Sequence, residues 1–156
     1  MVSEETYAKA VAQMAELNRA GSEIAGKYDV HSITDVTGFG LMGHTGEMAN
    51  GGNVTAVIES ANVPLLPEVL SLAEIGILPE GMYRNRNFAE PFSENAPNVT
   101  RAMMDVLFDP QTSGGLLLAV AEKDAPALLA ELTDKVPHAA RIGYVTEKQG
   151  CAVRVV

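Results

Sequence analysis

Apolar residues recur along this chain at spacings that predict helices and strands in alternation. Tyr7, Val11 and Met14 follow the typical N-cap residue Ser3 at helical spacing, so we expect one long amphipathic helix over residues 3–26. Similar spacing predicts helices over residues 41–49, 68–75, 99–107 and 123–135. Short apolar or alternating runs predict strands over residues 30–34, 54–58, 116–121, 140–145 and 151–155.

The order of these segments predicts the fold class. Helices and strands alternate through most of the chain, but only Glu147-Lys-Gln-Gly150 separates the last two strands, which predicts an antiparallel hairpin. We therefore expect an α+β fold with a mixed β-sheet flanked by helices. Residues 76–97 are rich in Gly, Pro and Asn, and we expect a long loop there that is functional or partly mobile.

Size and charge limit the classes of function. With 156 residues, 47% of them hydrophobic, the chain suits a single domain over residues 1–156. Twenty acidic residues against eleven basic ones give a formal charge of −9. This charge repels nucleic acid and anionic membrane surfaces over about 8 Å at physiological salt, so neither is an expected partner. The longest apolar run, residues 116–121, is far too short to span a bilayer and is expected to be a buried strand.

The cysteine content and the first residues bear on the compartment. Cys151 is the one cysteine, so it has no partner for a disulfide within the chain, and we expect a buried structural thiol. The first residues are acidic rather than basic and apolar, which is unlike a secretory signal. The sequence therefore predicts a cytoplasmic protein.

A glycine-rich segment, Ile33-Thr-Asp-Val-Thr-Gly-Phe-Gly-Leu-Met-Gly-His44, joins a predicted strand to a predicted helix. Asp35 ends the strand, and the glycines free the backbone where the helix begins. A carboxylate, bare amides and a helix N-terminus then converge, which suits a divalent cation or a phosphate.

Two other interpretations of this segment exist. Gly38-Phe-Gly40-Leu-Met-Gly43, with Glu59 after the next strand, has the spacing of a dinucleotide fingerprint. The polar residues before Gly38 and the antiparallel end of the chain argue against it. Alternatively, Asp35 or Thr37 caps the helix and the glycines only permit close packing. The number of polar residues and glycines exceeds what a cap needs and favours a site.

A second segment, Asp109-Pro-Gln-Thr-Ser-Gly-Gly-Leu-Leu-Leu-Ala-Val120, has a similar composition. Its hydroxyls and glycine amides suit an anion, but a tight turn into the following strand explains it equally well.

Both segments strongly resemble signature segments of the selenophosphate synthetase (selenide, water dikinase) family, in the same order and at a similar separation. Gly81-Met-Tyr-Arg-Asn85 and Arg141-Ile-Gly-Tyr144 resemble two further segments of that family. The resemblance covers this whole chain but only the C-terminal half of the family's protein. It implies the fold of the aminoimidazole ribonucleotide synthetase superfamily, whose C-terminal domains are α+β with a mixed sheet.

The resemblance also implies a reaction, in which ATP, selenide and water become selenophosphate, phosphate and AMP with Mg²⁺ required. In that family an N-terminal domain carries the reactive Cys or selenocysteine, a lysine and most of the nucleotide site. We therefore expect this chain to partner such a domain within a homodimeric enzyme, to contain no catalytic residue, and to be inactive alone. Cys151 is near the wrong end to be the nucleophile.

One family ligand maps onto this chain, because the resemblance makes Asp35 a Mg²⁺ ligand beside the ATP phosphates. Phosphate-side contacts are expected from two sets of residues, namely Thr37, Gly38 and Gly40 in the first segment and Thr112, Ser113 and Gly114 in the second. Arg84 and Arg86 suit phosphate binding, or else pairing with carboxylates such as Glu80 and Glu90. We expect His44 to be a packing or hydrogen-bonding residue.

Two alternatives to this function remain at the level of sequence. One is another ATP-dependent enzyme of the same superfamily, and the other is a freestanding metal- or nucleotide-binding module. In a domain cut from a larger enzyme, surface that normally packs on the N-terminal domain is exposed and suits self-association.

Overall fold

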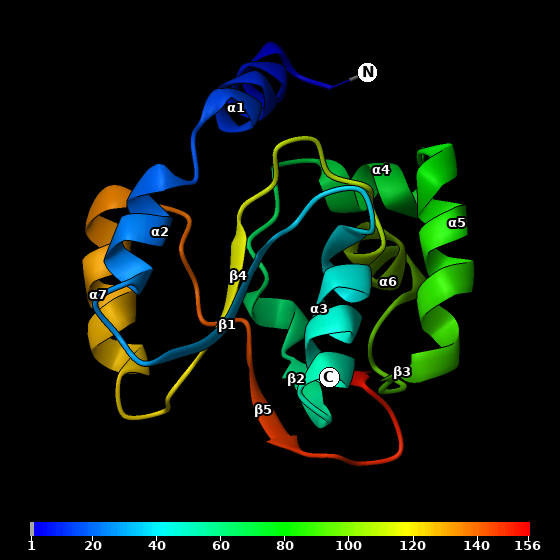
Figure 1. Ribbon diagram of the computed structural model, residues 1–156. Coiled ribbons are helices and arrows are strands. Elements are labelled where there is room, and N and C mark those ends of the chain that lie inside the picture. Colours follow the sequence, from blue (N-terminus) through cyan, green and yellow to red (C-terminus); the bar gives the residue numbers. More distant parts are fainter. Residues whose placement is uncertain (1) are drawn as a thin grey trace.

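The computed structural model describes residues 2–156 and contains two β-sheets (Figure 1). Strands β1 (Val30–Asp35) and β4 (Leu116–Val120) form an antiparallel ribbon. The other sheet has the order β3-β6-β2-β5, and its members are β2 (Val54–Ile58), β3 (Ser93–Asn95), β5 (Gly143–Glu147) and β6 (Val153–Val155). Because β5 is antiparallel and β6 parallel to β2, this sheet is mixed. The expected α+β class with helices flanking a mixed sheet is confirmed.

Seven α-helices and two short 3-10 helices lie in the described residues. In Figure 1, α2 and α7 lie on one side of the β1–β4 ribbon, and α3, α5 and α6 lie on the other. Their bounds are α1 Glu4–Ala15, α2 Arg19–Ala25, α3 Gly40–Gly51, η1 Ser60–Asn62, α4 Val69–Glu74, α5 Glu80–Ala89, η2 Glu90–Phe92, α6 Arg101–Leu107 and α7 Ala125–Lys135.

Two clusters of apolar side chains hold these layers together. The larger joins α3, α5, α6 and β6, where Met42, Met82 and Val153 are completely shielded from solvent. Each such side chain contributes about 1.5–3 kcal/mol by leaving water. The smaller cluster packs α2 on α7 through Ile24, Leu128 and Leu132. The ribbon lies between the two clusters. Leu117 of β4 packs against the larger cluster and Val120 of β4 packs against the smaller one.

The single helix expected over residues 3–26 is wrong, because the chain forms two helices. Ser3 caps α1 as predicted by accepting from Thr6 N–H, but the backbone becomes extended at Glu16. The break lets α2 turn toward α7, where Ile24 is buried, whereas Tyr7 in α1 stays exposed. Both helices have apolar residues at helical spacing, so the pattern alone hides the break between them.

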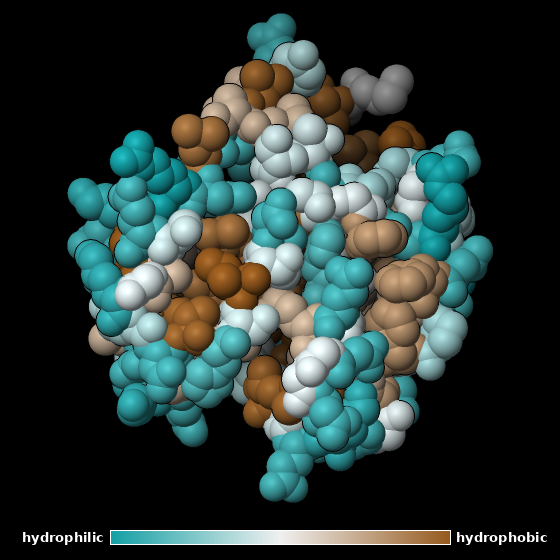
Figure 2. All heavy atoms as spheres, in the orientation of Figure 1, coloured by the Kyte–Doolittle hydropathy of each residue, from teal (hydrophilic) through white to brown (hydrophobic). Residues whose placement is uncertain are grey.

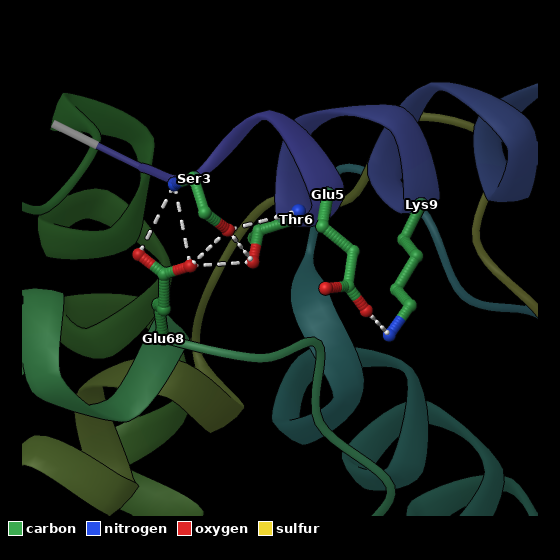
Figure 3. Close-up of polar contacts among 5 residues, drawn as sticks. All are labelled: Ser3, Glu5, Thr6, Lys9 and Glu68. Carbon is green, nitrogen blue, oxygen red and sulfur yellow. Dashed lines mark hydrogen bonds and ion pairs between the residues drawn. The ribbon is translucent and has the colours of Figure 1, made fainter.

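Helix α1 is held to the body mainly at its first turn (Figures 1 and 3). The Ser3 and Thr6 hydroxyls each donate to the Glu68 carboxylate at 2.6 Å. These hydrogen bonds lower the pKa of Glu68. Figure 3 also shows the Glu5–Lys9 ion pair one turn further along the helix.

The terminal hairpin predicted from strands 140–145 and 151–155 is also wrong. Strand β2 lies between β5 and β6 and pairs with both. Buried Thr55 of β2 fixes the connection, because its hydroxyl donates to Cys151 C=O and accepts from Gln149 N–H. The short connection therefore passes around the end of β2 instead of forming a tight turn.

The long loop expected over residues 76–97 is largely ordered secondary structure, comprising α5, η2 and β3. Gly81, Asn85 and Asn87 are poor helix formers, so local propensity predicts a loop there. Tertiary packing overrides propensity, because Met82, Asn85 and Ala89 face the core on one side of α5. The other predicted elements occur with shifted ends, although β4 is half-buried rather than buried. No helix within residues 2–156 is both long and apolar enough to cross a membrane.

Cys151 is buried and unpaired, as predicted. Burial raises the pKa of its thiol, and the nearby Glu94 carboxylate raises it further. Because the thiolate is the reactive form, we expect almost no reaction with a thiol reagent such as DTNB at pH 7.5 in the native protein. Full reaction of one thiol should follow unfolding in guanidinium chloride. Rapid labelling of the native protein would contradict the burial.

Candidate functional site

The β1–β4 ribbon brings the two glycine-rich segments together at one of its ends. Asp35, the last residue of β1, pairs with Leu116, the first residue of β4. Residues 36–39 and 109–115 therefore form two adjacent loops, which we call the first loop and the second loop. Val36 N–H donates to Gly115 C=O at 2.8 Å, and Gln111 N–H donates to Thr37 C=O at 3.0 Å. Two segments far apart in sequence thus form one surface.

Two glycines allow the loops and their flanking residues to approach so closely. Gly40 has φ +68°, and a Cβ there would lie 2.8 Å from Asp109 C=O. A Cβ at Gly114 would lie 2.0 Å from Val36 C=O. Any side chain would therefore push the loops apart. By contrast, a Cβ at Gly38 would meet nothing within 4 Å. Packing explains Gly40 and Gly114 but does not explain Gly38.

Asp35 is exposed at the start of the first loop. Helix α3 has Phe39 as its N-cap residue with no side-chain capping bond, so the interpretation of Asp35 or Thr37 as a cap is wrong. Among the described residues, no side chain or backbone N–H forms a hydrogen bond or ion pair with the Asp35 carboxylate. A free, solvated carboxylate is the kind of oxygen ligand that Mg²⁺ prefers. Residues 2–156 contain no cluster of three His, Cys, Asp or Glu side chains that could hold a metal ion. Asp35 therefore fits a metal shared with other ligands.

The other predicted phosphate contacts lie in the two loops or, for Gly40, at the start of α3. Gly38, Thr112 and Ser113 are exposed, and Thr37 is half-buried. Ser113 adopts φ +51°, in the left-handed region that a non-glycine residue rarely occupies. These hydroxyls and amides are available to an anion, while Gly40 and Gly114 mainly serve packing.

His44 is buried on α3 and forms polar contacts, as expected for a packing or hydrogen-bonding residue. Its Nε2 lies 3.3 Å from the Thr37 hydroxyl, and its Nδ1 lies 3.2 Å from the Glu47 carboxylate. These contacts link the middle of the first loop to the second turn of α3.

Both candidate arginines already have carboxylate partners. Arg84 pairs with Glu80 at 2.7 Å, which confirms the second of the two alternatives for this residue, pairing with a nearby carboxylate. Arg86 pairs with buried Asp105 and not with Glu90. Arg86 is therefore held in a buried ion pair, whereas the Arg84–Glu80 pair lies on the exposed surface.

Two features of the site escaped the sequence analysis. Asn85 of α5 donates from its side-chain amide to Gly38 C=O in the first loop and to Phe108 C=O, which immediately precedes the second loop. The Phe39 ring stacks on Phe88 with centroids 5.4 Å apart, and both rings are nearly half exposed. The only sequence signal for Asn85 was its place in the Gly81-Met-Tyr-Arg-Asn85 segment. The aromatic pair gave no signal, because it depends on how α5 packs.

Asp109 begins the second loop in a half-buried position, and burial raises the pKa of its carboxyl above the ordinary value. The folded state therefore holds this proton more tightly than the unfolded state, so stability falls as pH rises from the unfolded pKa through the folded one. We expect Asp109→Asn to raise the midpoint of urea unfolding at pH 7 in metal-free buffer. The gain should vanish below about pH 3.8, the ordinary pKa of Asp.

The control for this prediction is Asp134→Asn on the exposed surface of α7, which should change stability little at either pH. A loss of stability in Asp109→Asn at pH 7 would show that the carboxylate has a favourable partner in the folded chain.

The dinucleotide interpretation of Gly38-Phe-Gly40-Leu-Met-Gly43 is not compatible with this geometry. A dinucleotide fold requires parallel strands on both sides of the glycine turn. Here β1 pairs antiparallel with β4, and β2 belongs to the other sheet.

Comparisons with known proteins agree with this fold. The family described as "AIR synthase related protein, C-terminal domain" matches residues 2–156, and the chain belongs to this family. The hydrogenase maturation protein HypE has a similar structure, with a TM-score of 0.55 at 23% identity over 90% of this chain and 36% of HypE. HypE in complex with ATP gives the same TM-score over 88% of this chain. At this identity the likeness concerns the fold alone.

Within this class of domain, the curated relatives named here are selenide, water dikinases. The chain is 41% identical to selenide, water dikinase 2 of Peptoclostridium acidaminophilum over its whole length and 45% of that protein. It is 42% identical to the Porphyromonas gingivalis enzyme over the same shares of both chains. It is 40% identical to the Clostridium botulinum (Eklund 17B) enzyme over 95% of this chain and 43% of that enzyme. The resemblance found in the sequence is confirmed, and this chain spans less than half the length of these relatives.

Proposed function

We propose that this chain is the C-terminal domain of a selenide, water dikinase that converts ATP, selenide and water into selenophosphate, phosphate and AMP. The observation that carries the proposal is that both signature loops meet at the end of the β1–β4 ribbon where Asp35, whose carboxylate has no partner among the described residues, is exposed. About 40% identity to enzymes of that name over the whole chain supports it.

In this proposal the chain provides some of the residues of an active site, and the rest of the enzyme provides the others. Asp35 would hold Mg²⁺ together with ligands from the rest of the enzyme, as a partial carboxylate site with substrate phosphates commonly does. Bound Mg²⁺ would offset the charge that develops on the leaving phosphoryl groups. Exposed hydroxyls of Thr112 and Ser113 and amides near Gly38 would orient the phosphates.

A bound cation would offset the repulsion between this acidic chain and the phosphates of ATP. The formal charge of the chain is −9, and the Arg86 guanidinium is held in a buried ion pair with Asp105. The two loops, residues 36–39 and 109–115, offer hydrogen-bond donors but contain no Lys or Arg. This arrangement makes phosphate binding depend on Mg²⁺ at Asp35.

The exposed apolar face of α1 supports a missing partner domain. Tyr7 is 66% exposed, and Val11 and Met14, which follow it at helical spacing, are 44% and 43% exposed. Figure 2 shows hydrophobic side chains over α1 at the top of the molecule, and further hydrophobic patches on the face below it. Exposed apolar surface of this kind marks an interface. We propose that the rest of the enzyme covers this face.

Reconstitution from separate parts tests the proposal. Selenide-dependent AMP formation is measured by chromatography for this chain alone, for the remaining part of the enzyme alone, and for the mixture. We expect activity only in the mixture. Val11→Asp should weaken reconstitution about tenfold or more, because it places a charge on the apolar face. Gln13→Asp on the opposite face of α1 is the matched control. AMP formation by this chain alone would contradict the proposal, as would a mixture that makes ADP.

A further inference from the structure

Asn85 is a buried polar residue that donates hydrogen bonds to the first loop and to the residue that precedes the second loop. It lies on α5 with only 6% of its surface exposed. Its Nδ2 donates to Gly38 C=O at 2.8 Å and to Phe108 C=O at 2.9 Å. An amide group has two N–H donors, and both are used here. Within residues 2–156, no other side chain donates to both the first loop and the residue that precedes the second.

The two acceptors lie where a hydrogen bond from Asn85 can fix the position of the first loop relative to the start of the second loop. Gly38 C=O lies in the middle of the first loop, three residues after Asp35. Phe108 C=O immediately precedes Asp109, where the second loop begins. Phe108 is itself buried, so this carbonyl is a fixed point. The Asn85 amide therefore connects the first loop to the C-terminal end of α6.

The bond to Gly38 also fixes the direction of a peptide group. The chain has no cis peptide bond among its described residues, and in a trans peptide the C=O and N–H point in opposite directions. With Gly38 C=O directed at Asn85, the Phe39 N–H must point away from α5. Glycine at position 38 would otherwise allow this peptide to rotate easily. Asn85 removes that freedom.

We propose that Asn85 is a positioning residue that holds the two loops in the arrangement required for phosphate and metal binding. It acts through Gly38 and Phe108 and does not itself touch the substrate. Its catalytic consequence rests on the proposed function, but its effect on the loops does not. The two parts can therefore be tested separately.

Amide hydrogen exchange in this chain tests the effect on the loops. In Asn85→Asp the donors are replaced by a carboxylate that faces two carbonyl oxygens, with nearly unchanged shape. We expect the amides of Val36 and Gln111, which join the loops, to exchange about 10- to 100-fold faster. Ala56, whose N–H donates to Ala152 C=O in the large sheet, should exchange at an unchanged rate.

Two further variants keep this test decisive. Asn87→Asp makes the same change at an exposed position two residues along α5 and should leave all three amides unchanged. If Asn85→Asp fails to fold, Asn85→Ser removes the long donor without adding charge and should show the same local effect. Unchanged exchange at Val36 and Gln111 would overturn the proposal. An equal acceleration at Ala56 would also overturn it, because Asn85 would then serve only general stability.

Kinetics of the intact enzyme test the catalytic consequence. For Asn85→Ser, measured well below its melting temperature, we expect kcat to fall about tenfold or more. The Mg²⁺ concentration for half-maximal rate should rise, while Asn87→Ser leaves both values unchanged. Normal kcat and Mg²⁺ dependence in Asn85→Ser would overturn the catalytic part of the proposal. If the unsubstituted intact protein makes no selenophosphate, the proposed function fails, and the exchange experiment still decides whether Asn85 positions the loops.

Discussion

Asp35→Asn in the intact enzyme is expected to remove most of the selenide-dependent turnover of ATP while leaving the fold intact. Asn keeps the shape of Asp but lacks the negative charge that binds Mg²⁺. The loss of one group that stabilises developing charge commonly lowers the rate on the order of 100-fold. Steady-state rates at several Mg²⁺ concentrations measure this loss, and the half-saturating concentration should rise.

The control for this variant is Asp134→Asn, an equally exposed aspartate on α7, far from the loops in sequence. Circular dichroism and urea unfolding should be nearly unchanged in both variants, since the Asp35 carboxylate has no bonded partner among the described residues. Near-normal turnover in Asp35→Asn would remove the residue from the metal site.

Gly40→Ala should destabilise this chain by about 3 kcal/mol. The left-handed backbone conformation is unfavourable for alanine, and its Cβ would lie within 3 Å of the backbone of Phe108 and Asp109. The free energy of unfolding from urea titration measures the loss. Because the strain falls where the loops meet, the amides of Val36 and Gln111 should lose protection as well.

Gly38→Ala provides the matched comparison, since it makes the same change two residues earlier in open space. It should alter stability by less than about 1 kcal/mol. Equal losses in the two variants would show that the loops do not meet at Gly40 as described.

Local patterns in the sequence predicted most elements but few of the contacts between them. Amphipathic spacing located α3, α6 and α7, because this signal depends on neighbouring residues in the sequence. The separation of α1 from α2 and the formation of α5 depend on packing partners elsewhere, such as α7 for Ile24 and the main core for Met82. Such partners leave no periodic signal in the segment itself.

In the site, too, the sequence predicted individual residues but not the contacts between them. Residue type and spacing identified both loops and Asp35 as candidates, because oxygen ligands and glycines at element ends have a chemical meaning. Their meeting depends on the register of β1 with β4, which single-sequence reasoning does not supply. Asn85 was missed for a related reason, since a polar residue on a predicted loop gives no sign that it will be buried against two carbonyls.

The three glycines of the first segment have different roles in the structure, which the sequence alone did not distinguish. Three glycines in Gly38-Phe-Gly40-Leu-Met-Gly43 suggested one shared purpose. Gly40 admits the backbone of the second loop, and Gly43 makes room for the Phe39 side chain, whereas Gly38 is open to solvent. Only Gly38 remains as a glycine that a ligand contact would explain.

A phosphorus NMR time course tests the central claim most directly. ATP, Mg²⁺ and selenide are incubated under anaerobic conditions with this chain alone and with the intact protein that contains it. We predict AMP, phosphate and a selenophosphate resonance with the intact protein, and no turnover with this chain alone. ADP as the end product, or turnover that does not depend on selenide, would contradict the assignment and point to another ATP-dependent enzyme of the same superfamily.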